Sequence, residues 1–328
     1  MTDILLIGTA TPRMVEQLSA RHRVHKAWEQ KDFDAFLVQH GGEIEGVSIY
    51  GASRIDAKLI DRLPALKIIS NFGVGYDAVD VGHAANKGIV VTHTPDVLNR
   101  DVANTAIMLM LAVSRCLIRD DNWVRSGRWK SQGAAPLTRS IEGKCVGILG
   151  LGRIGRTIGE KLGAFDCKIS YHSRSPRGDT PWTYCNSAEE LAANVDYLVV
   201  ITPGGAGTRH LVDRDVINAL GPDGTLINVA RGSVVDENEL VAALVEGRLG
   251  YAGLDVFENE PEVPEALFAM ENVVLTPHVG SATVESRQAM GDLVVKNLLR
   301  FFDDGTVATP VPECRHFARI AGKASARR

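Results

Sequence analysis

The amino-acid sequence predicts an α/β fold with two domains, each built on a doubly wound parallel sheet. Three observations predict it: a length of 328 residues, a globular composition with 45% hydrophobic and 23% charged residues, and short apolar runs that alternate with helical patterns. A single core rarely grows past about 250 to 300 residues, so the length favours two domains. Runs that are apolar at consecutive positions are typical of parallel strands covered on both faces.

The first series of elements lies in the N-terminal part of the chain. Helices are predicted at residues 12–21 and 56–62, where apolar residues recur at helical spacing. The alternation of strand and helix indicates a parallel sheet with crossover helices. Strands are predicted at residues 4–7, 47–50, 67–70 and 89–92.

A second and more apolar series follows. Helical spacing at residues 101–115 and again at 283–302 predicts two long helices that leave the first domain and return to it. The first domain is therefore expected to be discontinuous, with residues 1–99 and 284–328, and the second to hold residues 100–283. Strands of the second domain are predicted at residues 145–149, 168–171, 197–201, 225–229, 252–256 and 273–275.

Charge and cysteine content disfavour several classes of partner. The formal net charge of -4 provides no uniform field for nucleic acid or an anionic membrane. The five cysteines form no Cys-x-x-Cys pair and no close cluster with histidine, which predicts a reducing cytoplasm and no metal site. Asp3 stands where a secretory signal would be basic, and the longest apolar run, 106–113, is too short to span a bilayer. The basic end, residues 315–328, is expected to be a solvated terminus.

The clearest local motif is a glycine loop at residues 150–155, which read Gly-Leu-Gly-Arg-Ile-Gly. The first glycine permits a tight turn, the second lets the backbone approach a pyrophosphate, and the third allows close packing of helix on strand. The helix N-terminus that follows offers free N–H groups and partial positive charge to the phosphates. Because the loop joins an apolar strand to a helical pattern, it predicts a dinucleotide-binding Rossmann domain.

The choice of cofactor is predicted from the end of the next strand. NAD binders place an acid there, which hydrogen-bonds the adenosine ribose. This chain has Ser173 and Arg174 at that place. Without the carboxylate nothing repels a 2′-phosphate, and a guanidinium can pair with it through charge-assisted hydrogen bonds, so the pair predicts NADP(H). The alternative is that Arg174 is a solvated loop residue in an NAD(H) enzyme with a relaxed site.

Five further segments carry motifs whose order along the chain is characteristic. They are residues 73–77 (Gly-Val-Gly-Tyr-Asp), 91–95 (Val-Thr-His-Thr-Pro), 228–232 (Asn-Val-Ala-Arg-Gly), 253–261 (Gly-Leu-Asp-Val-Phe-Glu-Asn-Glu-Pro) and 276–281 (Thr-Pro-His-Val-Gly-Ser). With the glycine loop between them, they resemble the D-isomer-specific 2-hydroxyacid dehydrogenases. Within that family, residues 171–174 and 261–264 look most like NADPH-dependent glyoxylate/hydroxypyruvate and hydroxyphenylpyruvate reductases. The resemblance implies a Rossmann cofactor domain and a flavodoxin-like substrate domain with a cleft between them.

Reduction of a 2-oxo acid needs a cation for the carboxylate and a proton donor for the carbonyl oxygen, while the nicotinamide supplies the hydride. Arg231 has the fixed charge and planar fork that suit the carboxylate. A histidine titrates near neutrality, so His278 can give a proton to the forming alkoxide. Glu260 is expected to hydrogen-bond the other ring nitrogen and stabilise the protonated form. These three are the predicted catalytic residues.

The resemblance also implies binding residues. The backbone amides of Val74 and Gly75, together with Arg231, are expected to bind the substrate carboxylate. Asp255 is expected beside the nicotinamide, and Val229 and Ala230 beneath the cofactor. The full set of expected cofactor contacts is Leu151, Gly152, Arg153, Ile154, Ser173, Arg174, Thr202, Pro203, Thr208, Val229, Ala230, Asp255, His278 and Gly280.

The expected activity is NADPH-dependent reduction of glyoxylate and hydroxypyruvate to D-2-hydroxy acids, with acceptance of NAD(H) left open. The resemblance implies a homodimer joined through the cofactor domains, with residues 101–115 in the interface. Reduction of bulkier acids such as phenylpyruvate or hydroxyphenylpyruvate is an alternative, because residues 131–140 lack the aromatic that reductases of small acids often place there. A second alternative is a dinucleotide-binding regulator without catalysis.

Overall fold

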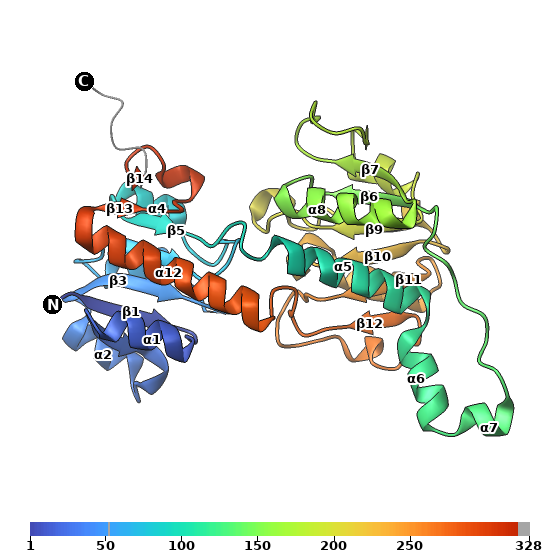
Figure 1. The fold of residues 1–328 in the computed structure, drawn as a ribbon, viewed down its shortest axis with the longest axis horizontal. Helices are drawn as coiled ribbons and strands as arrows, with labels where there is room; N and C mark the ends of the chain where they lie inside the picture. Colours follow the sequence, from blue (N-terminus) through green and yellow to red (C-terminus); the bar gives the residue numbers. More distant parts are fainter. Residues whose placement is uncertain (52, 321–328) are drawn as a thin grey trace. The chain divides into compact units, whose positions relative to one another are not determined.

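The computed structural model describes residues 1–51 and 53–320, so part of the basic C-terminal segment lies outside the described residues. The chain divides into two compact units (Figure 1). Unit 1 comprises Met1–Leu98 and Thr283–Arg328, and unit 2 comprises Asn99–Ala282. Each unit contains its own parallel sheet.

Unit 1 contains a five-stranded parallel sheet in the order β2-β1-β3-β4-β5. The chain runs from β1 to β2 on one side and then returns to β3 on the other side of β1, so the topological switch point lies between β1 and β3. This is the flavodoxin-like order. The strands are β1 (Asp3–Ile7), β2 (Arg23–Lys26), β3 (Ile44–Ile49), β4 (Ile68–Asn71) and β5 (Val90–Thr92), and β13 (Thr306–Val307) pairs separately with β14 (Arg319–Ile320).

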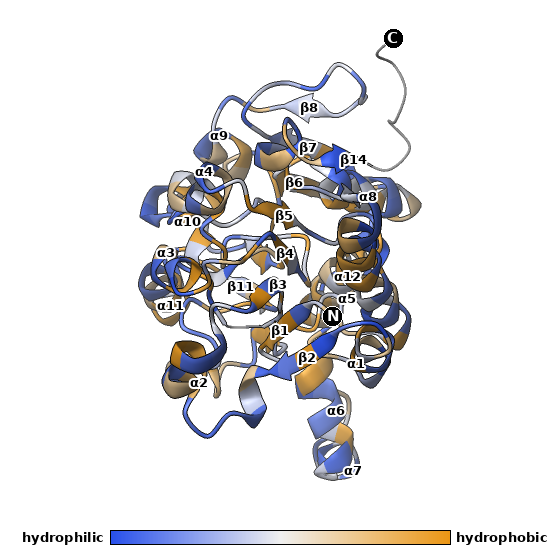
Figure 2. Ribbon diagram, turned by 90° about the vertical axis from the view of Figure 1, so that its left-hand side faces the viewer, coloured by the Kyte–Doolittle hydropathy of each residue, from blue (hydrophilic) through white to orange (hydrophobic). Residues whose placement is uncertain are grey.

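Helices cover both faces of this sheet. Helices α1 (Pro12–Ser19) and α12 (Val284–Asp304) lie together on one face (Figure 2). On the opposite face, α2 (Phe33–His40), α3 (Ala57–Asp61) and α4 (Val81–Asn86) enclose a core that includes Leu5, Val47 and Ile69. Short 3-10 turns complete the unit at η1 (Ala27–Glu29) and η6 (Pro312–Cys314).

Unit 2 contains a seven-stranded parallel sheet in the order β12-β11-β10-β9-β6-β7-β8. Its first six strands in the chain follow the Rossmann order, with the switch point between β6 and β9. The prediction of two doubly wound parallel sheets is confirmed. The strands are β6 (Cys145–Leu149), β7 (Lys168–His172), β8 (Thr183–Tyr184), β9 (Tyr197–Val200), β10 (Thr225–Asn228), β11 (Tyr251–Leu254) and β12 (Val273–Leu275).

The helices of unit 2 also form two layers (Figure 2). Helices α5 (Asn99–Ser114) and α8 (Arg153–Leu162) pack together on one face. Helices α9 (Ala188–Ala192), α10 (Arg214–Leu220) and α11 (Glu237–Val245) cover the other. The remaining elements are α6 (Leu117–Arg125), α7 (Arg128–Gln132), η2 (Gly163–Phe165), η3 (Ala206–Thr208), η4 (Gly232–Val234) and η5 (Glu265–Leu267).

Within the five-stranded and seven-stranded sheets, the apolar patterns did not predict two strands, β2 and β8. Both are edge strands, and neither has a fully buried residue. The strand β2 reads Arg-Val-His-Lys and is hydrophilic in Figure 2, while β8 spans only two residues. An edge strand needs no second buried face, so its sequence lacks the continuous apolar run that marks the inner strands.

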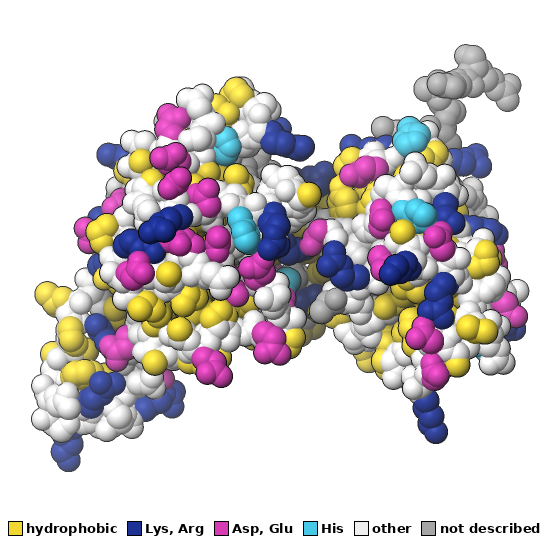
Figure 3. Space-filling view, turned by 180° about the vertical axis from the view of Figure 1, so that it is seen from behind, with side chains coloured by type: hydrophobic (Ala, Val, Ile, Leu, Met, Phe, Trp, Pro, Cys, Tyr) yellow, Lys and Arg dark blue, Asp and Glu magenta, His cyan; other side chains and the backbone are white. Residues whose placement is uncertain are grey.

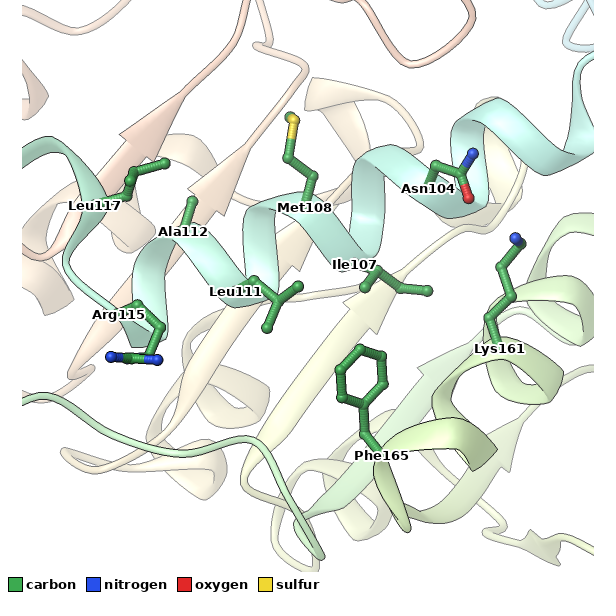
Figure 4. Close-up of a pocket in the computed structure, with 9 residues that line it drawn as sticks. All are labelled: Asn104, Ile107, Met108, Leu111, Ala112, Arg115, Leu117, Lys161 and Phe165. Atoms are coloured by element: carbon green, nitrogen blue, oxygen red, sulfur yellow. The ribbon is translucent and has the colours of Figure 1, made fainter.

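The surface of unit 2 bears a groove of about 570 Å³ along α5, which we call the α5 groove. Ile107 and Leu111 project from α5 on the side of Phe165 (Figure 4). Met108 and Leu117 also line the groove and are 45% and 54% exposed. Helices α6 and α7 extend away from the rest of unit 2 as an arm, which carries Trp129 at 63% exposure (Figure 1).

Charges of both signs are interspersed on the face of the molecule seen in Figure 3. Among the described residues, no single helix has the length and apolar character that a membrane crossing requires. Helices α5 and α6 taken together are long and apolar enough for a crossing, but the chain bends by 59° between them.

Candidate active site

The predicted cofactor and catalytic residues of unit 2 all follow the carboxyl ends of strands in one sheet. Because the strands are parallel, their carboxyl ends lie at the same edge. The glycine loop follows β6, Arg174 follows β7, Thr202 follows β9, Arg231 follows β10 and His278 follows β12. Sheet topology thus gathers residues that are far apart in the sequence.

The glycine loop lies at the switch point. Gly150 has a φ of +111°, and a Cβ there would lie 2.9 Å from the Thr202 nitrogen, so only glycine fits. A Cβ on Gly155 would lie 2.2 Å from the Gly150 carbonyl oxygen, which explains the close packing of α8 on the loop. At Gly152, by contrast, no atom lies within 4 Å of a Cβ position. Leu151 is buried and Ile154 half-buried, whereas Arg153 is exposed.

The N-cap residue of α8 is Gly152, which has no side chain to accept a capping hydrogen bond. The first amides of α8 therefore point from the helix end without the acceptor that a Ser, Thr or Asp cap supplies. The open space at Gly152 lies at the same end of the helix. This is the arrangement that binds a phosphate at a helix N-terminus.

The loop after β7 presents Arg174 to solvent. The Arg174 side chain is exposed and has no hydrogen-bonding or ion-pairing partner among the described residues. The Ser173 hydroxyl donates to the Ser175 carbonyl at 2.8 Å, within the same loop. Arg156 of α8 holds the loop by an ion pair with Asp179 at 2.7 Å.

The loop after β9 contains both an unpaired and a paired hydroxyl. Thr202 Oγ1 is buried and has no hydrogen-bond partner among the described residues. A buried hydroxyl without a partner costs free energy and calls for an explanation such as a ligand. Thr208 Oγ1 instead donates to the Pro203 carbonyl at 2.6 Å, so it closes the loop on itself. Pro203 is exposed.

Asn228, at the end of β10, shapes the turn that carries Arg231. Its side-chain oxygen accepts from the Ala230 N–H at 3.1 Å, and its amide group donates to the Arg231 carbonyl at 3.1 Å. Val229 and Ala230 are buried, and Arg231 is half-buried. An Arg231 guanidinium nitrogen donates to the Ala230 carbonyl at 2.7 Å.

Asp255 is 1% exposed, and its carboxylate accepts three hydrogen bonds from the loop that carries His278. Oδ1 accepts from the Thr276 hydroxyl at 2.7 Å and the Val279 N–H at 2.8 Å, and Oδ2 accepts from the Gly280 N–H at 2.8 Å. The resemblance implies a place beside the nicotinamide for Asp255. In the structure its carboxylate holds the loop of residues 276–280, a role that the sequence did not predict.

His278 and Glu260 form a hydrogen-bonded pair. The distance from His278 Nδ1 to Glu260 Oε2 is 2.7 Å, and the side chains are 45% and 30% exposed. Glu260 Oε1 also accepts from the Phe257 N–H at 3.1 Å. Burial alone would raise the pKa of Glu260. The hydrogen bond and charge of His278, the Phe257 N–H and the charge of Arg231 outweigh burial and lower that pKa.

The segment around Glu260 is held from three sides. A Cβ on Gly232 would lie 1.9 Å from the Phe257 carbonyl carbon, so the Arg231 turn touches the Phe257–Glu258 peptide. Glu258 accepts from Arg209 at 2.7 Å through its side chain, and its N–H donates to Glu237 at 3.0 Å. Asn228 and Gly232 lie in the segment 228–232 that carries the resemblance, but no role was predicted for either of them or for Glu237. The polar Asn228 at the end of an apolar strand was the one available signal.

In unit 1 the loop after β4 contains Val74 and Gly75, both half-buried. The Asn71 side-chain amide donates to the carbonyls of Gly73 and Gly75 at 3.0 and 2.9 Å. His93 Nδ1 lies 3.0 Å from the Val74 carbonyl. The loop carbonyls thus have partners inside the protein, whereas the amides of Val74 and Gly75 have no acceptor among the described residues.

The next residue, Tyr76, is fixed by the C-terminal segment. Its hydroxyl donates to the Glu313 carboxylate at 3.2 Å. Burial, together with the nearby charge of Glu313, raises the pKa of Tyr76 to about 12. Tyr76 therefore keeps its proton and its hydrogen bond at any pH near neutrality.

The residues at the edge of the unit 2 sheet fit a dinucleotide. Gly152 leaves open space at an uncapped helix end, and Thr202 contributes a buried hydroxyl that no described residue pairs with. Both features flank the switch point, where open α/β sheets bind their ligands. Arg174 is available to an anion beyond β7.

Comparison with known proteins gives a consistent picture. Residues 107–280 match the family model described as D-isomer specific 2-hydroxyacid dehydrogenase, NAD binding domain. The chain is 51% identical to hydroxyphenylpyruvate reductase of Plectranthus scutellarioides and 49% identical to a glyoxylate/hydroxypyruvate reductase of Arabidopsis thaliana. Each match covers 94% of this chain and 98% of the relative.

A solved structure is also similar. It is the NADPH-dependent glyoxylate/hydroxypyruvate reductase of Sinorhizobium meliloti, in complex with NADP and malonate. The two chains are 48% identical, with a TM-score of 0.92, and the match covers 98% of this chain and 99% of that one.

The Rossmann sheet, the glycine loop and the histidine–carboxylate pair define a dinucleotide-binding protein with acid–base groups at the same sheet edge. With the family match and relatives at 51% and 49% identity, the resemblance noted from the sequence is confirmed. The chain belongs to the D-isomer-specific 2-hydroxyacid dehydrogenase family.

The contact at Gly232 generates a prediction. Gly232→Ala places a methyl group where the Phe257 carbonyl carbon lies, and two backbone segments cannot separate without loss of packing. We expect the free energy of unfolding to fall by about 3 kcal/mol or more, as measured by urea denaturation. Gly163→Ala is the control, because no atom lies within 4 Å of its Cβ position. Equal unfolding midpoints for the two variants would contradict this account.

Proposed function

We propose that the protein reduces small 2-oxo acids, with glyoxylate and hydroxypyruvate preferred, to D-2-hydroxy acids at the expense of NADPH. One observation carries the proposal: His278 and Glu260 are paired at 2.7 Å at the same sheet edge as Arg231 and the glycine loop. A regulator would need no such proton donor. The names of the Arabidopsis and Sinorhizobium relatives support this substrate class.

Arg231 is assigned to the substrate carboxylate and carbonyl. Asn228 fixes the turn that carries it, and one guanidinium nitrogen is used by the Ala230 carbonyl. Its charge, delocalised over a planar fork, would orient the 2-oxo acid and polarise the bond to be reduced. The amides of Val74 and Gly75, whose loop carbonyls are already engaged, are assigned to the carboxylate as further donors.

His278 is assigned as the proton donor. Its Nδ1 is held by Glu260, which leaves Nε2 for the carbonyl oxygen as that oxygen becomes an alkoxide. Because Glu260 is ionised at neutral pH, its charge stabilises the imidazolium before transfer and orients the ring during transfer. In the reverse direction the same nitrogen would take the proton from the hydroxy acid.

The cofactor is assigned to the edge between β6 and β9. The uncapped N-terminus of α8 would receive the pyrophosphate, and Thr202 Oγ1 would gain the partner it lacks. When bound, NADPH supplies the hydride. Arg174 would pair with the 2′-phosphate, which distinguishes NADPH from NADH, since no acidic side chain stands at 173 or 174.

The proposal is tested by steady-state NADPH consumption with glyoxylate, hydroxypyruvate, phenylpyruvate and hydroxyphenylpyruvate, with NADH in parallel. We expect higher kcat/KM for the two small acids and a lower KM for NADPH than for NADH. A preference for the aromatic acids would favour a hydroxyphenylpyruvate reductase, the activity named for the Plectranthus relative. Bound NADPH without turnover of any acid would indicate a regulator.

The same assay tests the 2′-phosphate site through the double variant Ser173→Asp/Arg174→Ala. The variant adds an acid and removes the guanidinium, so the KM for NADPH should rise at least about tenfold. The KM for NADH should change much less. Equal changes in the two values would remove Arg174 from this role.

The Glu260 and His278 pair predicts a pH effect. In Glu260→Gln the imidazolium loses its counter-charge, so the protonated ring is less stable. Reduction requires the protonated ring, and the pH at which the reductive rate is half its maximum should therefore move to lower values. The profile of kcat/KM is measured from about pH 5 to about pH 9, which covers the range in which histidines titrate. An unchanged profile would exclude the role assigned to Glu260.

We further propose that the chain forms a homodimer through the α5 groove and the α6–α7 arm. The groove and arm expose Met108, Leu117 and Trp129 in one unit, and exposed apolar surface of this kind is typical of an interface. Exposed hydrophobic side chains are visible on the arm in Figure 3. A second copy is the occupant implied by the resemblance.

The dimer is tested by light scattering after size exclusion. The wild type should have twice the chain mass of 35.4 kDa. Met108→Glu places a charge in the α5 groove and should shift the protein to the monomer mass. Val245→Glu, on α11 and 65% exposed in the wild type, is the matched control and should leave the dimer intact. A monomeric wild type would disprove the proposal.

A further inference from the structure

Unit 1 places a guanidinium over two aromatic rings. Arg287 Cζ lies 5.1 Å from the ring centroid of Tyr50 and 5.9 Å from that of Phe72. The two rings meet edge to face, with their centroids 4.7 Å apart. These distances are within the range of cation–π attraction. The Arg287 side chain has neither an ion-pair nor a hydrogen-bond partner among the described residues.

The rings lie at the topological switch point of the unit 1 sheet. Tyr50 follows β3, and its N–H donates to the Ile7 carbonyl of β1 at 3.0 Å. The neighbouring Gly8 has a φ of +86°, and a Cβ there would lie 1.9 Å from the Tyr50 carbonyl oxygen. Open α/β sheets bind ligands outside the carboxyl ends of the strands at this point. The stacked guanidinium therefore marks a place where a ligand is expected.

The stack is continuous with the loop assigned to the substrate carboxylate. Phe72 directly precedes Gly73, and its N–H donates to the Ile49 carbonyl at 2.9 Å, which ties it to the end of β3. A substrate whose carboxylate meets Val74 and Gly75 would have its far end within this part of unit 1.

The chemistry of the stack indicates what it would bind. Cation–π contact with a ring uses the positive charge of the guanidinium, whereas its N–H groups remain available to donate to oxygen acceptors. The rings also restrict the side chain before a ligand arrives, so less rotamer freedom is lost on binding. Five N–H donors without a protein acceptor suit hydroxyl or carboxylate oxygens and not a hydrocarbon.

We propose that Arg287, held on Tyr50 and Phe72, binds the tail of the substrate beyond the reacting carbonyl. It selects 2-oxo acids whose tail carries oxygen acceptors over those with an apolar tail. The inference rests on the proposed 2-oxo acid reductase function and narrows its substrate class. Arg287 is a specificity residue and takes no part in proton transfer.

The test compares hydroxypyruvate with pyruvate, which differ only by the tail hydroxyl. In Arg287→Met, which keeps a long apolar chain over the rings, the ratio of kcat/KM for hydroxypyruvate to that for pyruvate should fall about ten- to a hundredfold. That is the effect of losing one hydrogen bond to a charged group. A purely structural role would lower both values alike and leave the ratio unchanged, which would overturn the proposal.

Two further variants keep the result interpretable. Arg287→Lys retains the charge without the planar fork and should give an intermediate ratio, so it serves if the Met variant unfolds. Lys296→Gln removes an exposed positive charge from the same helix and should leave the ratio at the wild-type value.

Reduction of glyoxylate by the wild type tests the proposed function separately, since glyoxylate has no tail. A wild type that does not prefer hydroxypyruvate to pyruvate would also overturn the proposal.

Discussion

The active-site edge of unit 2 depends on one buried carboxylate. Asp255 accepts three hydrogen bonds from the loop of residues 276–280, and its own N–H donates to the Asn228 carbonyl at 2.9 Å. His278, in this loop, has a φ of +52°, an uncommon conformation for a residue with a side chain. Such a conformation persists only where the surroundings over-determine it. The bonds to Asp255 provide that constraint and join the His278 loop to the end of β10.

The Arg231 turn and the Glu260 segment are held by backbone contacts of the same kind. Asn228 closes the turn, and Gly232 lets that turn touch the Phe257–Glu258 peptide. The Arg231 turn, the Glu260 segment and the His278 loop are thus each attached to a strand end or to one another by buried contacts. A site built on strand ends is more precise than one carried by free loops, because the sheet fixes the positions of those ends.

Sequence patterns predicted the sheets well because the inner strands must be apolar on both faces. The same physics explains why β2 and β8 were missed, since an edge strand has no such requirement. The glycine loop could be predicted from the sequence because each glycine meets a separate steric requirement, as the contacts at Gly150 and Gly155 show. The structural role of Asp255 could not be predicted from the sequence, because it depends on backbone amides that only the fold brings within 2.8 Å of its carboxylate. Arg287 was missed for the same reason, since its aromatic partners lie far away in the sequence.

Three carboxylates, Glu237, Glu258 and Glu260, interact around the segment that carries Glu260, and their surroundings differentiate them. Glu258 is neutralised by Arg209 at 2.7 Å and contacts His210 at 3.2 Å. Burial raises the pKa of Glu237, and the charges of Glu258 and Glu260 add to that rise although the Glu258 N–H opposes it. Only Glu260 combines a lowered pKa with a hydrogen bond to His278. Glu260 is therefore the carboxylate of the three whose charge acts on the imidazole, whereas Glu258 pairs with Arg209 and Glu237 accepts from the Glu258 N–H.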